Sequence, residues 1–110
     1  MEEVIKRFKE YVYAVDEENI ETVLVKLLKK HKLKIALAES CTGGMFSARV
    51  INTPGASAVY EAGFVTYANK AKHKLIGVKN KTLKEYGAVS KETAKEMVKG
   101  TLKASEADYA

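Results

Sequence analysis

The side chains best suited to chemistry are gathered in one run of six residues: Glu39, Ser40, Cys41, Thr42, Gly43 and Gly44. An apolar stretch at residues 35–38 precedes the run and is typical of a buried strand. The two glycines allow the chain to turn sharply into the helix expected next. A helix that begins at such a turn presents backbone N–H groups that suit a phosphate or a developing oxyanion. We therefore expect nucleophilic chemistry at this turn.

Ser40 and Cys41 are alternative nucleophiles, and both need activation. A serine hydroxyl requires a neighbouring base, whereas a cysteine thiol requires a lowered pKa. Histidine is the usual base, but we expect both His31 and His73 to be surface residues. A lysine can take this role where burial disfavours its ammonium form.

Lys72 is a candidate base because it follows the strand expected at residues 64–67 by one helical turn. It can point back over the carboxyl edge of the sheet, where the turn at Ser40 also opens. Spacing alone does not select Lys72 over Lys70 or Lys74. Tyr67 ends that strand, so its hydroxyl either reaches the same rim or belongs to an ordinary core tyrosine.

The other residues of the run have candidate supporting roles. Glu39 precedes the turn and could hold backbone amides in place. The segment Thr42–Gly44 could form a concave nest of N–H groups for an anion. A small-residue turn with two glycines is by itself a weakly specific motif.

The elements that position these residues alternate along the chain. Strands are expected at residues 11–15, 34–38 and 64–67, and short helical stretches at residues 2–9 and 56–62. Longer helices are expected at residues 20–30, 45–51, 70–76, 81–86 and from residue 91 onward. This order predicts the α/β class, a three-layer α/β/α arrangement with a small, mostly parallel sheet. The sheet is expected to be incomplete at its C-terminal side, because no strand follows the last helix.

Caps and apolar faces refine this prediction. Helix caps are expected at Asp16, Asn69 and Ser90. The helix over residues 20–30 presents an apolar stripe of Ile20, Val23, Leu24, Leu27 and Leu28. The inward face of the last helix is expected to consist of Ala94, Met97, Val98 and Leu102.

Length and composition limit the classes to which the protein can belong. The chain has 110 residues, of which 46% are hydrophobic, which favours one folded domain. No stretch reaches the roughly 20 apolar residues of a membrane span, so no membrane partner is expected. The lone cysteine excludes an internal disulfide and favours the reducing cytoplasm.

The net charge of +5 raises the question of nucleic-acid binding. Only two arginines are present, and no aromatic residues interleave the most regular basic row. That row has helical spacing, so a solvated face is favoured over a nucleic-acid interface; its members are Lys91, Lys95, Lys99 and Lys103.

The full string AESCTGG at residues 38–44 is more specific than its parts, and it resembles the signature of the CinA C-terminal domain family. This family includes nicotinamide mononucleotide deamidases of the PncC type. The string GFVTYANKAK at residues 63–72 resembles the family's Gly-x-Val-Thr-Tyr-Ser-Asn-x-x-Lys segment, with Ala68 in place of the serine. Residues 53–58, 75–78 and 86–90 resemble further family strings. The resemblance covers residues 20–110 as a partial domain, and residues 1–19 look like the linker of long, two-domain CinA proteins.

The resemblance implies an amidohydrolase that converts nicotinamide mononucleotide and water to nicotinate mononucleotide and ammonia, in pyridine nucleotide salvage. It implies a Ser-Lys dyad in which Ser40 is the nucleophile and Lys72 the general base, with Tyr67 assisting. Neither a metal nor a cofactor is required. The implied substrate-binding residues are Glu39, Cys41, Thr42, Gly43, Gly44 and Asn69.

The family pattern continues beyond the last helix into further strands, a glycine-rich loop and an arginine that contacts substrate, all absent from this C-terminally truncated version. Two other functions are therefore considered: a non-catalytic CinA fragment or interaction module, and a competence-associated protein linked to nucleic acid. The uncovered face of the last helix predicts a homo-oligomer.

Overall fold

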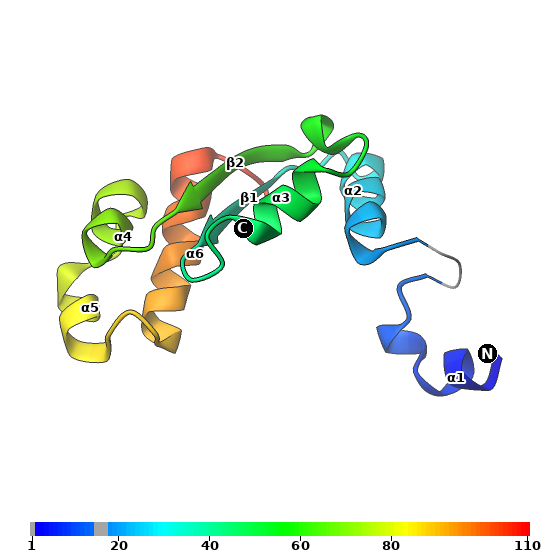
Figure 1. Ribbon diagram of the computed structural model, residues 1–110, viewed down its shortest axis with the longest axis horizontal. Helices are drawn as coiled ribbons and strands as arrows, with labels where there is room; N and C mark the ends of the chain where they lie inside the picture. The colour runs from blue at the N-terminus through cyan, green and yellow to red at the C-terminus, as the bar shows by residue number, and fades with distance from the viewer. Residues whose placement is uncertain (1, 15–17) are drawn as a thin grey trace.

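A computed structural model describes residues 2–14 and 18–110 of the chain. Its sheet consists of two parallel strands, β1 (Ile35–Glu39) and β2 (Tyr60–Val65), as Figure 1 shows. Parallel strands need a crossover between them. The crossover here consists of helix α3 (Met45–Ile51) and the short 3-10 helix η2 (Ala56–Ala58). The other helices are α1 (Glu2–Arg7), η1 (Lys9–Tyr11), α2 (Ile20–Lys30), α4 (Asn69–Ile76), α5 (Asn80–Tyr86) and α6 (Lys91–Ser105).

Two apolar clusters cover the opposite faces of this sheet. The first cluster joins α2, α3 and η2 to the sheet and includes Val25 and Val50, with Leu37 packed against it. The second joins α4 and α5 to α6 around Ile76, with Ala38 packed against it. Because neighbouring residues of a strand face opposite ways, Leu37 and Ala38 place the clusters on the two faces. The predicted α/β class with helices on both sides of a small parallel sheet is confirmed.

The strand predicted at residues 11–15 is wrong for the residues that the structure describes. Tyr11 ends η1, and residues 12–14 have no regular structure, while Val15 lies outside the described residues. A strand is stable only beside another strand, and among the described residues none lies beside this segment despite its aromatic and β-branched side chains.

The second strand begins earlier than the sequence predicts. The helical stretch expected over residues 56–62 shrinks to η2, and β2 already starts at Tyr60 instead of residue 64. Gly63 leaves room for the side chain of Tyr60, because a Cβ atom at position 63 would overlap the Tyr60 hydroxyl. That hydroxyl donates a 2.8 Å hydrogen bond to the Oγ of Ser47 and so ties β2 to α3.

The predicted helix boundaries agree with the structure better than the predicted buried faces of the helices do. Helix α3 has the expected bounds, while α4 and α5 each begin one residue early and end as expected before Gly77 and Gly87. In α2 the buried apolar residues are Val25 and Leu28, whereas Ile20 and Leu27, predicted for the inner stripe, are 54% and 51% exposed. The α2 stripe is therefore rotated relative to the prediction.

Helix α6 buries threonines where apolar residues were predicted. Of the four residues predicted to face inward, Met97 and Leu102 are half-buried, and Met97 packs against the second cluster, while Ala94 and Val98 are exposed. Thr93 and Thr101 are fully buried. The burial is possible because both hydroxyls donate to backbone carbonyls, that of Thr93 to Gly87 and that of Thr101 to Met97.

Of the three predicted caps, one is confirmed. Ser90 caps α6 by accepting a hydrogen bond from the amide of Thr93. Asp16 lies outside the described residues, and Asn19 caps α2 by accepting from the amide of Thr22. Asn69 is the first residue of α4, and the cap position belongs to Ala68, which has no side-chain acceptor.

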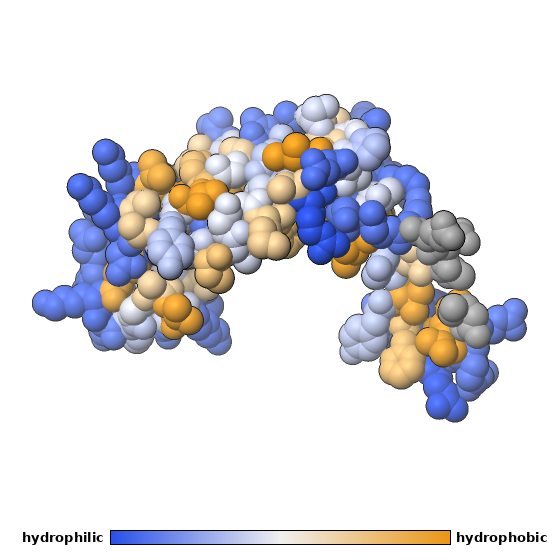
Figure 2. Space-filling model, viewed as in Figure 1, coloured by the Kyte–Doolittle hydropathy of each residue, from blue (hydrophilic) through white to orange (hydrophobic). Residues whose placement is uncertain are grey.

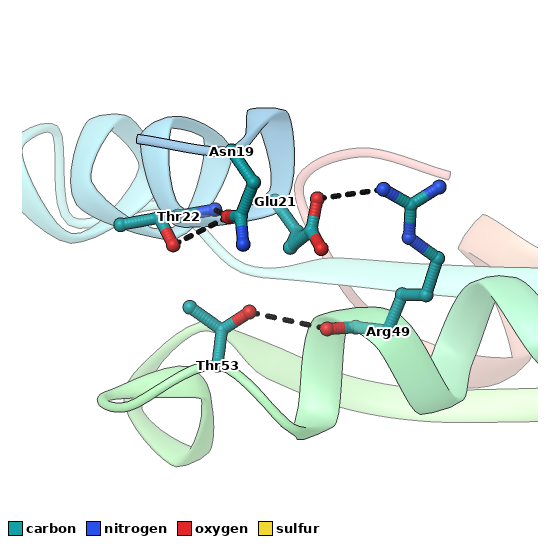
Figure 3. Close-up of polar contacts among 5 residues, drawn as sticks. All are labelled: Asn19, Glu21, Thr22, Arg49 and Thr53. Carbon is teal, nitrogen blue, oxygen red and sulfur yellow. Dashed lines mark hydrogen bonds and ion pairs between the residues drawn. The ribbon is translucent and has the colours of Figure 1, made fainter. Parts of the chain in front are cut away.

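Side-chain contacts hold α2 against α3. Arg49 of α3 donates a 2.8 Å charged hydrogen bond to Glu21 of α2, as Figure 3 shows. The carbonyl of Arg49 also accepts from the hydroxyl of Thr53, which closes the end of α3. These contacts fix the helix that follows the candidate catalytic turn.

The N-terminal segment buries no side chain in α1 or η1. Apolar atoms therefore remain at its surface, where Figure 2 shows them beside charged residues; the exposed members are Val4, Phe8, Tyr11 and Tyr13. None of the described helices is both long and apolar enough to cross a membrane.

Candidate active site

The turn that carries Ser40 connects the carboxyl end of β1 to α3. The amide of Gly43 donates to the carbonyl of Ser40, and the amide of Met45 donates to the carbonyl of Thr42, each over 3.1 Å. Gly43 and Gly44 have φ angles of 61° and 104°. Residues with side chains rarely adopt this left-handed region, so the two glycines allow the turn to be this short.

Glu39 holds the turn and the helix together. Its buried carboxylate accepts hydrogen bonds from the Thr42 hydroxyl at 2.8 Å and from the amides of Phe46 and Ser47 at 2.8 and 3.0 Å. The prediction that Glu39 holds backbone amides is confirmed. The expected free helix N-terminus is wrong in part, since this carboxylate already occupies two first-turn amides of α3.

The same contacts determine the ionisation of Glu39. Burial by itself raises the pKa of the Glu39 carboxyl, but the hydrogen bonds from Ser47, Phe46 and Thr42 outweigh it and lower that pKa below 4.5. Glu39 is therefore a carboxylate at neutral pH. Its role in the site is to position the turn.

Lys72 reaches Ser40 from the first turn of α4. The lysine side chain is buried, with 1% of its surface exposed. Its Nζ atom lies 3.2 Å from the Oγ of Ser40, 2.7 Å from the carbonyl oxygen of Thr66 and 2.9 Å from that of Tyr67. Lys70 and Lys74 are exposed, so of these three lysines it is Lys72 whose buried amine lies beside Ser40.

The other predicted site residues lie around this pair. Tyr67 meets Lys72 through its backbone carbonyl, while its side chain is 74% exposed. Asn69 and Cys41, which are close to Lys72 and Ser40 in sequence, are both exposed. The histidines are on the surface as predicted, and the Nδ1 of His73 lies 2.8 Å from the Val78 carbonyl.

The turn also offers amides that could stabilise an oxyanion. Within residues 2–14 and 18–110, the amides of Thr42 and Gly44 donate no hydrogen bond. In the same part of the chain, no three His, Cys, Asp or Glu side chains lie close enough together to hold a metal ion.

Sequence reasoning missed Thr66. This threonine is fully buried at the end of β2; its amide donates to the carbonyl of Glu39, and its own carbonyl accepts from Lys72. Its Oγ1 atom has no hydrogen-bond partner among the described residues. Such a position gives no sequence signal, because its contribution comes from the backbone.

Two grooves adjoin the turn. One of about 440 Å³ lies between α2 and α3 and is bordered by Thr42, Phe46 and Arg49. The other, of about 250 Å³, lies between α3 and α6 and reaches Glu39. Neither of these two grooves is lined by Ser40 or Lys72; the larger meets the turn at Thr42 and the smaller reaches Glu39, the residue before Ser40.

Comparison with known proteins identifies relatives of this chain. Residues 17–110 match the CinA C-terminal domain. A competence-damage inducible protein of Thermoanaerobacter sp. is 51% identical over 100 residues, which are 91% of this chain and 24% of that protein. A CinA-like protein of Thermotoga neapolitana is 47% identical over 108 residues, which are 98% of this chain and 26% of that protein. The chain thus spans about a quarter of the length of these relatives.

Solved structures show the same fold. The competence/damage inducible protein CihA from Agrobacterium tumefaciens superposes with a TM-score of 0.81 at 38% identity, covering 88% of this chain and 59% of that one. A CinA superfamily protein from Escherichia coli superposes with a TM-score of 0.81 at 31% identity, covering 92% of this chain and 61% of that one.

Proposed function

Because the chain belongs to the CinA C-terminal domain family, we propose that it carries the Ser-Lys dyad of an amidohydrolase that acts on nicotinamide mononucleotide. The products would be nicotinate mononucleotide and ammonia. The observation that supports this proposal is the 3.2 Å approach of the Lys72 amine to the Ser40 hydroxyl. That distance is within the reach of a general base and its nucleophile.

The surroundings of Lys72 suit a neutral amine as well as an ammonium. A neutral amine has two N–H donors and one lone pair, whereas an ammonium has three donors. The carbonyls of Thr66 and Tyr67 can accept the two N–H groups, which leaves the lone pair directed at Ser40. In this form Lys72 can accept the hydroxyl proton.

The reaction would then proceed in two stages. The Oγ of Ser40 attacks the carboxamide carbon while its proton moves to Lys72, and the amides of Thr42 and Gly44 stabilise the oxyanion. The C–N bond breaks, Lys72 returns the proton to the leaving nitrogen, and ammonia departs. Water then hydrolyses the ester on Ser40 to release the carboxylate.

The groove between α2 and α3 is a candidate binding place for the nucleotide. Its volume of about 440 Å³ is within the range of small-ligand sites, and it is lined by Thr42, which lies in the same turn as Ser40. Tyr67, whose side chain is exposed, and Asn69, the exposed first residue of α4, would contact substrate from the α4 side.

Hydrolysis of nicotinamide mononucleotide by the purified chain tests the proposal. We expect equal amounts of ammonia and nicotinate mononucleotide, measured by an enzyme-coupled assay and by chromatography. Ser40→Ala should abolish both products. Equal rates for the chain and for Ser40→Ala would contradict the proposal.

A fluorophosphonate probe tests the nucleophile independently of the substrate. Such a probe phosphonylates activated serines, so we expect it to label Ser40 in the unmodified chain and in Cys41→Ala. Cys41 is the matched control, because it is the exposed neighbour of Ser40 and the alternative nucleophile. Labelling that survives Ser40→Ala but not Cys41→Ala would assign the chemistry to the cysteine.

Two alternatives from other classes remain predictions. For a non-catalytic fragment, we expect no product from nicotinamide mononucleotide, whether or not the nucleotide binds. A nucleic-acid role would need DNA binding that weakens steeply with salt. The basic row of α6 is exposed and available to such a test; its members are Lys91, Lys95, Lys99 and Lys103.

A further inference from the structure

Glu39 is connected to both members of the proposed dyad, each through a different group. Its backbone carbonyl accepts a 2.8 Å hydrogen bond from the amide of Thr66, whose own carbonyl accepts from the Lys72 amine. Its carboxylate accepts from the hydroxyl of Thr42, in the turn that carries Ser40. A movement of this carboxylate relative to the backbone of Glu39 would therefore move Ser40 relative to Lys72.

The two oxygens of the carboxylate have different partners. Oε1 accepts from the Thr42 hydroxyl and from the Phe46 amide, both over 2.8 Å. Oε2 accepts from the Ser47 amide over 3.0 Å. Oε1 thus holds the turn, while Ser47 holds the other oxygen and with it the orientation of the whole carboxylate.

Tyr60 of β2 completes this set of contacts. Its hydroxyl donates a 2.8 Å hydrogen bond to the Oγ of Ser47, in the space that Gly63 leaves open. The Ser47 Oγ accepts this bond, so its own proton remains available to another acceptor. Against the effect of burial, the amide and the hydroxyl of Ser47 both help to lower the pKa of Glu39. We call the series Tyr60–Ser47–Glu39 the hydrogen-bond relay.

We propose that Tyr60 and Ser47 are positioning residues for the proposed dyad, on which they act through the carboxylate of Glu39. The inference rests on the proposed function, because the pair of residues that the relay positions is the proposed dyad. Within the described part of the chain, neither of the two side chains donates a hydrogen bond to the dyad or accepts one from it. Their effect must therefore pass through Glu39.

The relay predicts a particular defect when the Tyr60 hydroxyl is removed. The Oγ of Ser47 loses its donor, so the serine hydroxyl is free to turn and the Oε2 of Glu39 is held less firmly. The carboxylate then spends less time in the orientation that holds the turn. The rate of the chemical step should fall, whereas the affinity for substrate should stay the same.

A titration of Glu39 tests the relay without substrate. The pKa of its carboxyl is followed by carbon-13 NMR in the unmodified chain and in Tyr60→Phe, which removes only the hydroxyl. We expect this pKa to rise toward the ordinary value of 4.5 in the variant, because weaker hydrogen bonds stabilise the carboxylate less. Tyr86→Phe is the matched control, since this half-exposed tyrosine lies on α5, and it should leave the titration of Glu39 unchanged.

The rate of fluorophosphonate labelling tests the effect on Ser40. Tyr60→Phe and Ser47→Ala should each slow labelling by about 2–10-fold, the effect of one hydrogen bond. The double variant should be no slower than Ser47→Ala, because both changes break the same relay. With nicotinamide mononucleotide, kcat should fall by the same factor at unchanged KM, and Tyr86→Phe should keep the full rate. Urea denaturation gives the conditions under which every variant is fully folded for these measurements.

The possible failures of the inference and of the proposed function are distinct. The inference is wrong if the unmodified chain is labelled and Tyr60→Phe keeps its full rate, or if the losses in the double variant are additive. A probe that does not label the unmodified chain would instead contradict the proposed function. The titration then decides on the relay, because a Glu39 pKa that is the same in Tyr60→Phe and in the unmodified chain would contradict it.

Discussion

The Nζ of Lys72 lies 3.2 Å from the Oγ of Ser40, although 32 residues separate them in sequence. The parallel pairing of β1 and β2 explains this approach, because both strands end at the same edge of the sheet. Ser40 follows β1 directly, and the first turn of α4 brings Lys72 back over that edge. The register that sets Glu39 beside Val65 therefore also sets the geometry of the dyad.

Replacing Lys72 by methionine should remove the base while keeping the volume of the side chain. We expect both hydrolysis of nicotinamide mononucleotide and fluorophosphonate labelling of Ser40 to fall by about 10²–10⁴-fold. Lys70→Met is the matched control, because Lys70 lies on the same helix but is exposed, and it should leave both rates unchanged. Equal losses in the two variants would contradict a specific role for Lys72.

Glu39→Gln should destabilise the fold and change its response to acid. The folded-state pKa of Glu39 is lowered below its ordinary value of 4.5, so the carboxylate contributes stability above that pH. This contribution is lost as the pH falls through the folded-state pKa. We expect the variant to lose about 1.5–3 kcal/mol of unfolding free energy at pH 7 and to show a flatter decline below pH 4.5, measured by urea denaturation.

Glu21→Gln is the control for this experiment. The pKa of Glu21 is also lowered, chiefly by the hydrogen bond from its own amide and further by Arg49, which outweigh burial. Glu21 holds no turn, so its variant should lose less stability at pH 7 than Glu39→Gln. A pH profile of Glu39→Gln that parallels the unmodified chain would show that another carboxyl governs the acid response.

The sequence predicted the structure of the candidate catalytic turn well because its signals are local. The glycines, the preceding apolar run and the acidic Glu39 all act within a few residues, and the bounds of α3 followed from them. Selecting Lys72 among three nearby lysines required the family resemblance, since burial of a lysine depends on tertiary contacts. Thr66 gave no signal at all, because its contribution to the dyad is a backbone carbonyl.

The misassigned strand and helix faces show the opposite case. The segment at residues 11–14 has strand-forming side chains, but neither β1 nor β2 pairs with it, so its propensity has no effect. In α6, Met97 packs inward as predicted, but Thr93 and Thr101 are buried in place of Ala94 and Val98, because the threonine hydroxyls have carbonyl acceptors. A hydropathy pattern does not record such hydrogen bonds, which form only after the elements are assembled.

Thr66→Val and Thr93→Val should change stability in opposite directions. Both threonines are fully buried, but the Thr66 hydroxyl has no partner among the described residues, while that of Thr93 donates to Gly87 over 2.7 Å. Removing an unpaired buried hydroxyl is expected to add about 1 kcal/mol of unfolding free energy, and removing a paired one to cost about 1–3 kcal/mol. Urea denaturation of the two variants measures both effects, and losses of equal size would show that Thr66 also has a partner.

Gly100→Ala should destabilise the chain although alanine is normally the better helix former. In an exposed helix interior this exchange stabilises by about 1 kcal/mol. At position 100 of α6, however, a Cβ atom would overlap the carbonyl oxygen of Ile76, where α4 ends against α6. Backbone cannot yield as a flexible side chain does, so we expect a loss of about 3 kcal/mol or more and a lower melting temperature.

Lys99→Ala separates this clash from a general effect of mutating α6. Lys99 is the exposed neighbour of Gly100 on the same helix, so its replacement should change the unfolding free energy by no more than about 0.5 kcal/mol. Because Ile76 and Lys72 share α4, the displacement in Gly100→Ala should also move the amine away from Ser40 and reduce fluorophosphonate labelling. A Gly100→Ala variant as stable as Lys99→Ala would mean that α4 and α6 are not in contact at this point.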